Sequence, residues 1–175
     1  MRPVSNIKIY RQWSMPSKST FTLAPIRELL ERLRVGNGWA DPYAGESKLA
    51  EFRNDINGKH DSSLDAVEFL RSFEDESIDG LLVDPPYSAR QITEVYDGLG
   101  KIKPLTAVYK QAVRIIKPNG YLVSFGWNSG GGGRSRGFMK EEILLVPHGG
   151  NHNDTIVTVE RKICDQLASS ASGKI

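Results

Sequence analysis

Cysteine is nearly absent from this sequence, which has a single one, Cys164, among 175 residues. A lone cysteine excludes an intramolecular disulfide framework and a zinc site built from several cysteines. Histidine is also scarce, and His60, His148 and His152 show neither His-Glu-x-x-His spacing nor another ligand pattern. We therefore expect no metal ion to take part in the function.

Long apolar runs and a strong excess of one charge are missing too. No stretch reaches the roughly 18 apolar residues that a membrane-spanning helix needs. The first 20 residues are polar and basic, so they do not form an apolar signal core. The 23 basic residues nearly balance 21 acidic ones, for a net charge of +2, and this total does not identify a partner. We expect a cytoplasmic protein that does not bind membranes.

The sequence that remains has the length and texture of one domain. A chain of 175 residues accommodates one compact core. We expect a basic N-terminal arm over residues 1–19, a folded domain over 20–164, and a small, polar, disordered tail over 165–175. Two separated basic segments, in the arm and around Arg134 and Arg136, would suit a polyanion or simply a solvated surface.

Helical and strand patterns alternate along the folded domain. Apolar spacing and capping signals predict four helices. One begins at Pro25, one covers residues 48–52, and one begins after Asp65. The fourth covers residues 105–117 and is ended by residues 118–120. Short apolar runs predict strands over residues 39–44, 53–56, 78–83, 121–126, 143–147 and 155–160. This alternation indicates an α/β fold whose mostly parallel sheet is covered on both faces and ends in an antiparallel hairpin.

Two segments outside these elements suggest loops. The glycine run over residues 130–133 is typical of a flexible surface loop. The polar stretch from Pro147 to Asp154 contains His148 and His152, but a hairpin connection explains its glycines and asparagines better than a metal site does.

The strongest chemical signal is Asp84-Pro85-Pro86-Tyr87, directly after the strand predicted over 78–83. Ligands of open α/β sheets bind beyond the carboxyl ends of the strands, where this tetrapeptide lies. Two prolines stiffen the turn and leave carbonyl oxygens free as acceptors. An aspartate beside such acceptors suits an NH2 group, and the tyrosine offers a flat face for a planar ring. A plain strand-ending turn is the weaker interpretation.

Asp84-Pro85-Pro86-Tyr87 resembles the catalytic motif of the S-adenosylmethionine-dependent amino-methyltransferases, which methylate exocyclic amines of adenine or cytosine in DNA. The preceding Asp-Pro-Tyr-Ala-Gly over residues 41–45 is similar to the cofactor motif of that family. The resemblance covers roughly residues 20–162, and the later part looks like small phage or prophage adenine methylases. It implies a single-domain, Rossmann-like class I methyltransferase fold with a seven-stranded sheet, in a bacterial or phage-infected host cell.

The resemblance also assigns cofactor contacts. It places the methionine moiety of S-adenosylmethionine against the loop formed by Asp41, Pro42, Tyr43, Ala44 and Gly45. It gives Asp55 to the ribose hydroxyls, a role that suits a carboxylate because it can accept two hydrogen bonds. The loop continues with Glu46 and Ser47, where many relatives have Ser-Gly or Gly-Gly.

Four further residues receive cofactor roles from the same resemblance. Asp65 and Ala66 match the position beside the adenine ring of the cofactor, although Asp65 also has the spacing of a helix cap. Phe21 and Pro25 lie where the N-terminal motif of the family lines the cofactor, and packing in the core is an equally good interpretation of both.

These residues predict direct methyl transfer to a base in DNA. Asp84 and the carbonyl of Pro85 would accept hydrogen bonds from the amine, Tyr87 would stack on a flipped-out base, and the methyl group would pass in line to nitrogen, leaving S-adenosylhomocysteine. Among relatives, Ser-Pro-Pro-Tyr is commoner for cytosine and Asn-Pro-Pro-Tyr for protein glutamine, so Asp84 favours N6 of adenine. Cytosine N4, RNA or protein glutamine as acceptor, and a catalytically silent binding module, stay open.

Target recognition is the feature for which the sequence has the least room. Larger relatives carry some 100 or more additional residues for a target-recognition domain, and here few residues separate Tyr87 from the helix at Leu105. Recognition of a DNA site would have to use short loops, the N-terminal arm or a second subunit in a homodimer. Arg90 and Gln91 and the loop over 127–136 are candidates for phosphate contacts.

Overall fold

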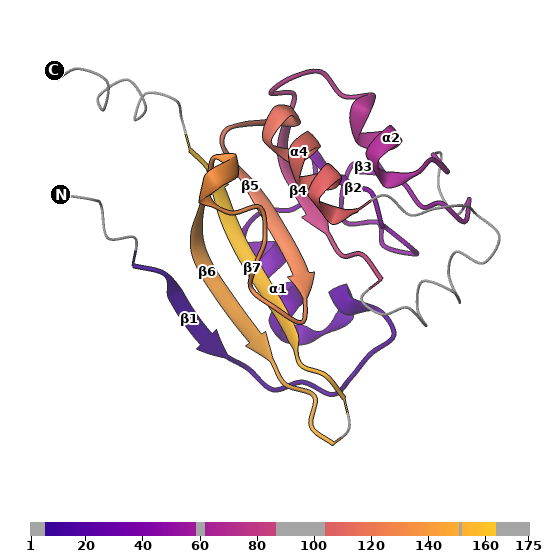
Figure 1. Ribbon diagram of the computed structural model, residues 1–175. Helices are drawn as coiled ribbons and strands as arrows, with labels where there is room; N and C mark the ends of the chain where they lie inside the picture. The colour runs from indigo at the N-terminus through magenta and orange to yellow at the C-terminus, as the bar shows by residue number, and fades with distance from the viewer. Residues whose placement is uncertain (1–5, 59–61, 87–103, 151, 164–175) are drawn as a thin grey trace, which may run out of the picture.

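The computed structural model describes residues 6–58, 62–86, 104–150 and 152–163, and a seven-stranded sheet forms its centre (Figure 1). The strand order is β1-β6-β7-β5-β4-β2-β3. The strands are β1 (Lys8–Arg11), β2 (Trp39–Asp41), β3 (Phe52–Arg53), β4 (Ile78–Val83), β5 (Ile116–Gly126), β6 (Phe138–Val146) and β7 (Thr155–Lys162). The helices are α1 (Ala24–Arg32), α2 (Ala66–Arg71) and α4 (Leu105–Ile115), with 3-10 turns η1 (Thr20–Thr22) and η2 (Arg134–Arg136).

The sheet contains mostly parallel strands and one antiparallel strand, as the sequence predicts. β3, β2, β4 and β5 run parallel, and β1 runs parallel to β6. β7 lies between β5 and β6 and is antiparallel to both, so β6 and β7 form the predicted C-terminal hairpin. All strands except β7 point in the same direction. The carboxyl ends of β2, β4, β5, β6 and β1 therefore lie along one edge of the sheet. The predicted α/β class and seven-stranded sheet are confirmed.

Helices cover both faces of the sheet because the strand residues alternate between them. On one face, Leu82 and Val123 pack with the apolar side of α1, which contributes Ile26, Leu29 and Leu30. On the other face, the strand residues pack with α2 and α4. That second core includes Leu81, Val83 and Leu122 from the strands with Leu70, Val108 and Ile115 from the helices. Burial on both faces explains why β4 has a nearly continuous apolar run over its last residues.

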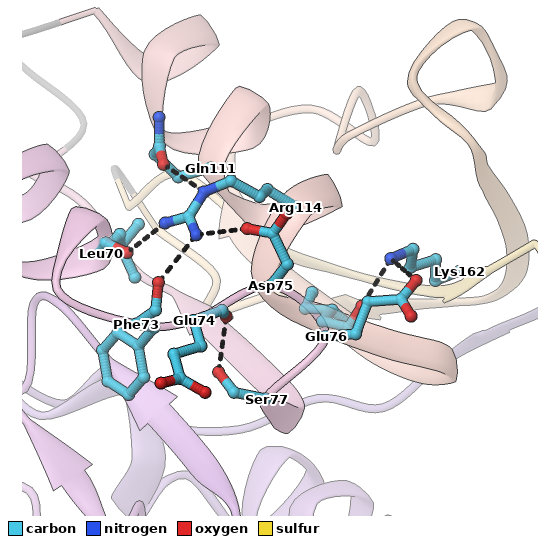
Figure 2. A network of polar contacts seen from close by, with 10 residues as sticks. Leu70, Phe73, Glu74, Asp75, Glu76, Ser77, Gln111, Arg114 and Lys162 are labelled. Carbon is cyan, nitrogen blue, oxygen red and sulfur yellow. Dashed lines mark hydrogen bonds and ion pairs between the residues drawn. The ribbon is translucent and has the colours of Figure 1, made fainter.

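A guanidinium joins α2 to α4 (Figure 2). Arg114, on α4, donates to the carbonyls of Phe73 at 2.7 Å and Leu70 at 3.1 Å, and it pairs with Asp75 at 2.8 Å. The last carbonyls of a helix lack partners within the helix, so Arg114 satisfies acceptors that would otherwise need water. Lys162 ties the end of β7 to the same region by donating to the Ile116 carbonyl at 2.7 Å.

Two helix predictions need correction. The helix expected over 48–52 does not form: the Ser47 hydroxyl accepts a hydrogen bond from the Leu49 amide, a local bond that competes with helix formation. The helix expected over 105–117 ends at Ile115, and the Pro118–Gly120 segment belongs to β5. The chain turns directly from helix to strand at Ile116, whose φ and ψ of −73° and 132° are extended.

Part of the expected N-terminal arm is a strand. Residues 8–11 form β1 at the edge of the sheet, where Tyr10 pairs in register with Leu144 of β6. The carboxylate of Glu142, which is 7% exposed, accepts hydrogen bonds from the Tyr10 hydroxyl and from Arg32 of α1. This contact fastens β1 to the domain. The expected tail and Cys164 lie outside the described residues. Within the described part of the chain, no helix is long and apolar enough to cross a membrane.

Candidate functional site

Two aspartates end neighbouring strands at the carboxyl edge of the sheet. β2 ends with Asp41 and β4 is followed by Asp84, and the two strands are paired in parallel through Ala40 and Leu81. The predicted cofactor loop and the predicted catalytic motif are therefore side by side. A pocket at this edge combines Asp84 with parts of the N-terminal segment and of the loop after β2. Its lining residues are Lys18, Ser19, Thr20, Phe21, Tyr43, Ala44, Gly45, Glu46, Ser47 and Asp84.

Backbone hydrogen bonds fix the shape of the loop after β2. The Tyr43 amide donates to the Asp41 carboxylate at 3.0 Å, and the Gly45 amide donates to the Asp55 carboxylate at 3.0 Å. Gly45 has a φ of +56°, and a Cβ at this position would have no atom within 4 Å. The residue is therefore a glycine for its conformation, and the space beside it is open to a ligand that approaches the backbone.

Asn54 supports this loop and was missed by sequence reasoning. Its buried side chain donates to the carbonyls of Pro42 at 3.1 Å and Leu64 at 2.9 Å. Its Oδ1 accepts from Ser62 at 2.7 Å and from the Leu64 amide at 2.9 Å. One side chain thus ties the cofactor loop to the segment before α2. A single asparagine within a predicted strand carries no sequence signal for this role.

Asp41 is a buried acid with one unsatisfied oxygen. It has no exposed surface, and among the described residues its Oδ2 atom has no hydrogen-bond partner. Burial is the main cause that raises the pKa of Asp41 to about 8; the hydrogen bond from the Tyr43 amide opposes this shift, and the nearby charges of Asp84 and Asp55 contribute to it. A buried carboxyl oxygen without a partner suits a cation or another hydrogen-bond donor supplied by a ligand.

Asp84 is partly buried, and its protonation is balanced near neutral pH. Burial raises the pKa of Asp84 to about 7, whereas a hydrogen bond with the side chain of Thr20 lowers it. Thr20 belongs to the η1 turn before α1, so the N-terminal segment directly contacts the predicted catalytic carboxyl. No motif in the sequence singles out this threonine. A carboxyl with this pKa can hold or accept a proton at physiological pH.

A second pocket lies on the other side of the prolines. Its walls come from the two prolines, α4, the end of β5 and the loop that follows β5. The lining residues are Pro85, Pro86, Leu105, Tyr109, Ser124, Phe125, Gly126, Trp127, Asn128 and Gly131. The hydroxyls of Tyr109 and Ser124 lie 3.4 Å apart inside it. The Asp84–Pro86 segment thus lies between two pockets, while Tyr87 is outside the described residues.

Several predicted cofactor residues do not line the first pocket. Pro25 is buried in the first turn of α1, and Asp55 accepts from the amides of Gly45 and Asn57. Asp65 caps α2 by accepting from the Val67 amide at 3.0 Å, and Ala66 is the first residue of that helix. The capping role predicted for Asp65 is confirmed. The cofactor roles of these residues stay predictions.

The glycine run is not a loose surface loop, which corrects the sequence prediction. The amides of Gly132 and Gly133 donate to the buried carboxylate of Glu160, at 2.6 and 3.0 Å. A Cβ on Gly132 would meet the side chains of Leu122 and Phe138 at 2.7 Å, so the loop lies directly on the sheet. The sequence indicated only that Glu160 belongs to a strand. Its anchoring role depends on a contact between residues far apart in the chain.

The basic residues of this loop lie away from the site. The loop leaves β5 at the carboxyl edge and returns to the start of β6, so Arg134 and Arg136 of η2 are at the opposite edge of the sheet (Figure 1). They do not flank either pocket. Arg90 and Gln91 are outside the described residues. The ring nitrogens of His148 contact the Ser14 carbonyl at 3.0 Å and the Thr155 hydroxyl at 2.9 Å, as part of the connection between β6 and β7.

Known proteins resemble this chain in fold but not in sequence. No protein-family model and no curated protein matches it. Among solved structures, the 1,6-didemethyltoxoflavin-N1-methyltransferase of Burkholderia thailandensis, crystallised with S-adenosylhomocysteine, has a TM-score of 0.55 and 12% identity. That match covers 84% of this chain and 80% of the other. The chain therefore has the Rossmann-like class I methyltransferase fold that the sequence predicted.

Two other matches are weaker in structure. TrmN from Thermus thermophilus has a TM-score of 0.49 at 18% identity, over 81% of this chain and 49% of that one. A candidate DNA modification methylase, also from Thermus thermophilus, has a TM-score of 0.40 at 20% identity, over 58% of this chain and 52% of that one. This chain spans about half the length of each of these two proteins.

Proposed function

We propose that this chain transfers the methyl group of S-adenosylmethionine to the N6 amino group of adenine in DNA, by direct displacement on a flipped-out base. The observation that carries the proposal is the position of the Asp84–Pro86 segment between two pockets at the carboxyl edge of a methyltransferase fold. One pocket would take the cofactor and the other the base. The catalytic domain would span residues 20–164.

The residues around the first pocket fit the proposed cofactor. S-adenosylmethionine supplies an activated methyl group on a sulfonium, and its methionine moiety carries an ammonium group. The open space at Gly45 allows close backbone contact with that moiety. Asp41, at the start of the same loop, is fully buried and does not line the pocket, so its cofactor role stays a prediction. Asp55 still has acceptor capacity for ribose hydroxyls, because each of its oxygens accepts one amide and has a second lone pair.

Asp84 would act on the amine of the base. The lone pair of an aromatic NH2 group is delocalised into the ring, so the amine is a poor nucleophile until hydrogen bonding draws it toward tetrahedral geometry. The carboxylate of Asp84 and the carbonyl of Pro85 would accept these bonds and stabilise the positive charge that develops on nitrogen. Thr20 would hold the Asp84 carboxylate in place through their hydrogen bond. Tyr87 keeps its predicted stacking role.

Methyl transfer from labelled cofactor to unmethylated DNA tests the proposal. The Asp84→Ala and Asp84→Asn variants are expected to lose at least about 10²–10³-fold in rate, because the amine loses its main acceptor. Calorimetry is expected to show that they still bind the cofactor. Asp79→Asn, which changes an exposed carboxylate on the same strand, is the matched control and is expected to keep the parent rate.

The pH dependence gives a second measurement. Because the pKa of Asp84 is about 7, the rate is expected to fall as the pH is lowered through 7 and the carboxyl takes up a proton. Equal turnover by parent and Asp84→Ala would overturn the assignment. Transfer to cytosine, RNA or protein glutamine in place of adenine would replace the acceptor, and no transfer to any of them would indicate a silent binding module.

A further inference from the structure

We infer that the segment from Arg11 to Lys18 is a preformed contact surface for duplex DNA beside the pocket that contains Asp84. This inference rests on the proposed function, because it names how the same substrate would be held. In the proposal, Arg11 and Lys18 contact backbone phosphates. Trp13 and Met15 pack against sugars or bases that flank the flipped nucleotide.

The charge of this segment favours a polyanion. The first acidic residue of the chain is Glu28, so every charged side chain before it is basic. Lys8 is partly compensated by Glu142 at 3.9 Å. Arg11 and Lys18, by contrast, have no ion pair with any residue that the structure describes. Two cations on one short segment, each without an ion pair among the described residues, are suited to phosphate groups.

Large apolar side chains are exposed between these two cations. Trp13 is 61% exposed and Met15 is 66% exposed. A tryptophan offers a flat face to bases and sugars, and a methionine adapts to irregular surfaces. Arg11, Trp13 and Met15 are alternate residues of an extended segment, so their side chains lie on the same side. The amides of Gln12 and Ser14, between them, point within the plane of the sheet toward β6 and the residue after it.

The segment is held firmly in this position. The Gln12 amide donates to the Leu145 carbonyl at 3.0 Å, and the Ser14 amide donates to the Pro147 carbonyl at 3.2 Å. The Ser14 carbonyl also contacts Nδ1 of His148 at 3.0 Å. These bonds continue the pairing of β1 with β6 and order the backbone in the free protein. A surface ordered before binding loses less entropy when DNA arrives.

The segment leads from the sheet edge directly into the proposed active site. It follows β1 along the carboxyl edge, and its last residue, Lys18, lines the pocket that contains Asp84. Two residues later, Thr20 is hydrogen-bonded to Asp84. A duplex that presents a flipped base to Asp84 would therefore run its flanking nucleotides along this segment. The basic η2 turn lies at the opposite edge and does not compete for this role.

Binding of a short unmethylated duplex, followed by fluorescence anisotropy at several salt concentrations, tests the inference. Trp13→Ala is expected to weaken binding about tenfold, since stacking on an aromatic side chain is lost. Arg11→Gln is expected to reduce the slope of log affinity against log salt by about one. Arg71→Ala removes the same charge from an exposed position on α2 and is expected to leave the slope unchanged.

The outcomes separate this inference from the proposed function. If the parent methylates DNA but both variants bind the duplex as the parent does, the surface is wrong and the function stands. If Trp13→Ala converts a dimer into a monomer in sedimentation, the segment is a contact between copies and the inference is overturned. If the parent neither binds nor methylates DNA, the proposed function itself fails. Thermal unfolding of each variant, expected to match the parent, checks that binding losses are local.

Discussion

Two buried acids, Asp41 and Glu160, sit on the same sheet with no exposed surface but in different surroundings. Asp41 ends β2 at the carboxyl edge, receives one amide bond and keeps one oxygen without a partner among the described residues. Glu160 lies within β7 and accepts the amides of Gly132 and Gly133. Burial raises the pKa of both, but at Glu160 the two amides and the charge of Lys140 oppose the shift.

The two acids differ in how far the described residues supply donors to their oxygens. At Glu160 the protein itself supplies donors, so the carboxylate anchors the chain that crosses the sheet face. At Asp41 one oxygen has no partner among the described residues, and burying it in this state costs free energy. Unsatisfied buried groups of this kind concentrate where a protein binds something.

The largest expected effect is the pH dependence of stability due to Asp41. Its folded-state pKa of about 8 lies above the ordinary 3.8, so the folded state binds an additional proton between these values. The stabilising contribution is complete below pH 3.8 and is lost as the pH rises to about 8. The free energy of unfolding should then fall by about 1.4 kcal/mol per pH unit in this window.

Urea unfolding of the cofactor-free protein at about pH 5.5, 6.5 and 7.5, all inside this window, measures the slope. Asp41→Asn cannot titrate and should flatten the slope by about one proton, whereas Asp154→Asn, at an exposed position, should not change it. An unchanged slope in Asp41→Asn would remove the distinction between the two acids.

A smaller but still large effect is expected from Glu160→Ala. The substitution leaves the amides of Gly132 and Gly133 buried without an acceptor, and it should lower the free energy of unfolding by about 3 kcal/mol. Glu74→Ala, at an exposed position, is the matched control and should change stability by less than about 0.5 kcal/mol. Chemical denaturation provides the measurement. If Glu160→Ala were as stable as the control, the anchoring role would be wrong.

The smallest of these effects concerns the loop that Glu160 holds. Gly132→Ala would place a Cβ 2.7 Å from the side chains of Leu122 and Phe138, and it should cost about 1–2 kcal/mol. Gly130→Ala meets only the flexible side chain of Asn128, so it should be milder. Thermal unfolding of the two variants compares them directly. Equal losses would mean that the loop does not rest on the sheet as closely as described.

The sequence predicted the elements whose signals are local. The apolar run before Asp84 and the capping spacing at Asp65 correspond to β4 and α2, because a few neighbouring residues determine them. The loop from Asp41 to Gly45 was recognisable because its five residues are similar to a known cofactor motif, and its glycine adopts the φ of +56° that other residues rarely take. The two aspartates then meet because parallel pairing aligns the carboxyl ends of β2 and β4.

What the sequence did not predict depends on distant partners. β1 lacks a long apolar pattern because it is an edge strand, and Tyr10 finds Glu142 across 132 positions of the chain. In the sequence, Glu160 is an ordinary strand residue, and its role depends on the amides of the glycine loop. Thr20 is an ordinary turn residue, and its role depends on the carboxyl of Asp84. Such roles follow from tertiary contacts, which local patterns do not encode.

The pairing of β1 with β6 also has a consequence during translation. β1 is synthesised well before its partner β6, which begins at Phe138. β1 therefore cannot pair with the sheet until the chain has been synthesised beyond β6. Until then, the exposed segment that follows β1 has no sheet edge to hold it, and Thr20 is not fixed beside Asp84. The nascent chain is therefore expected to gain its complete site only at a late stage of synthesis, after the hairpin of β6 and β7 has emerged.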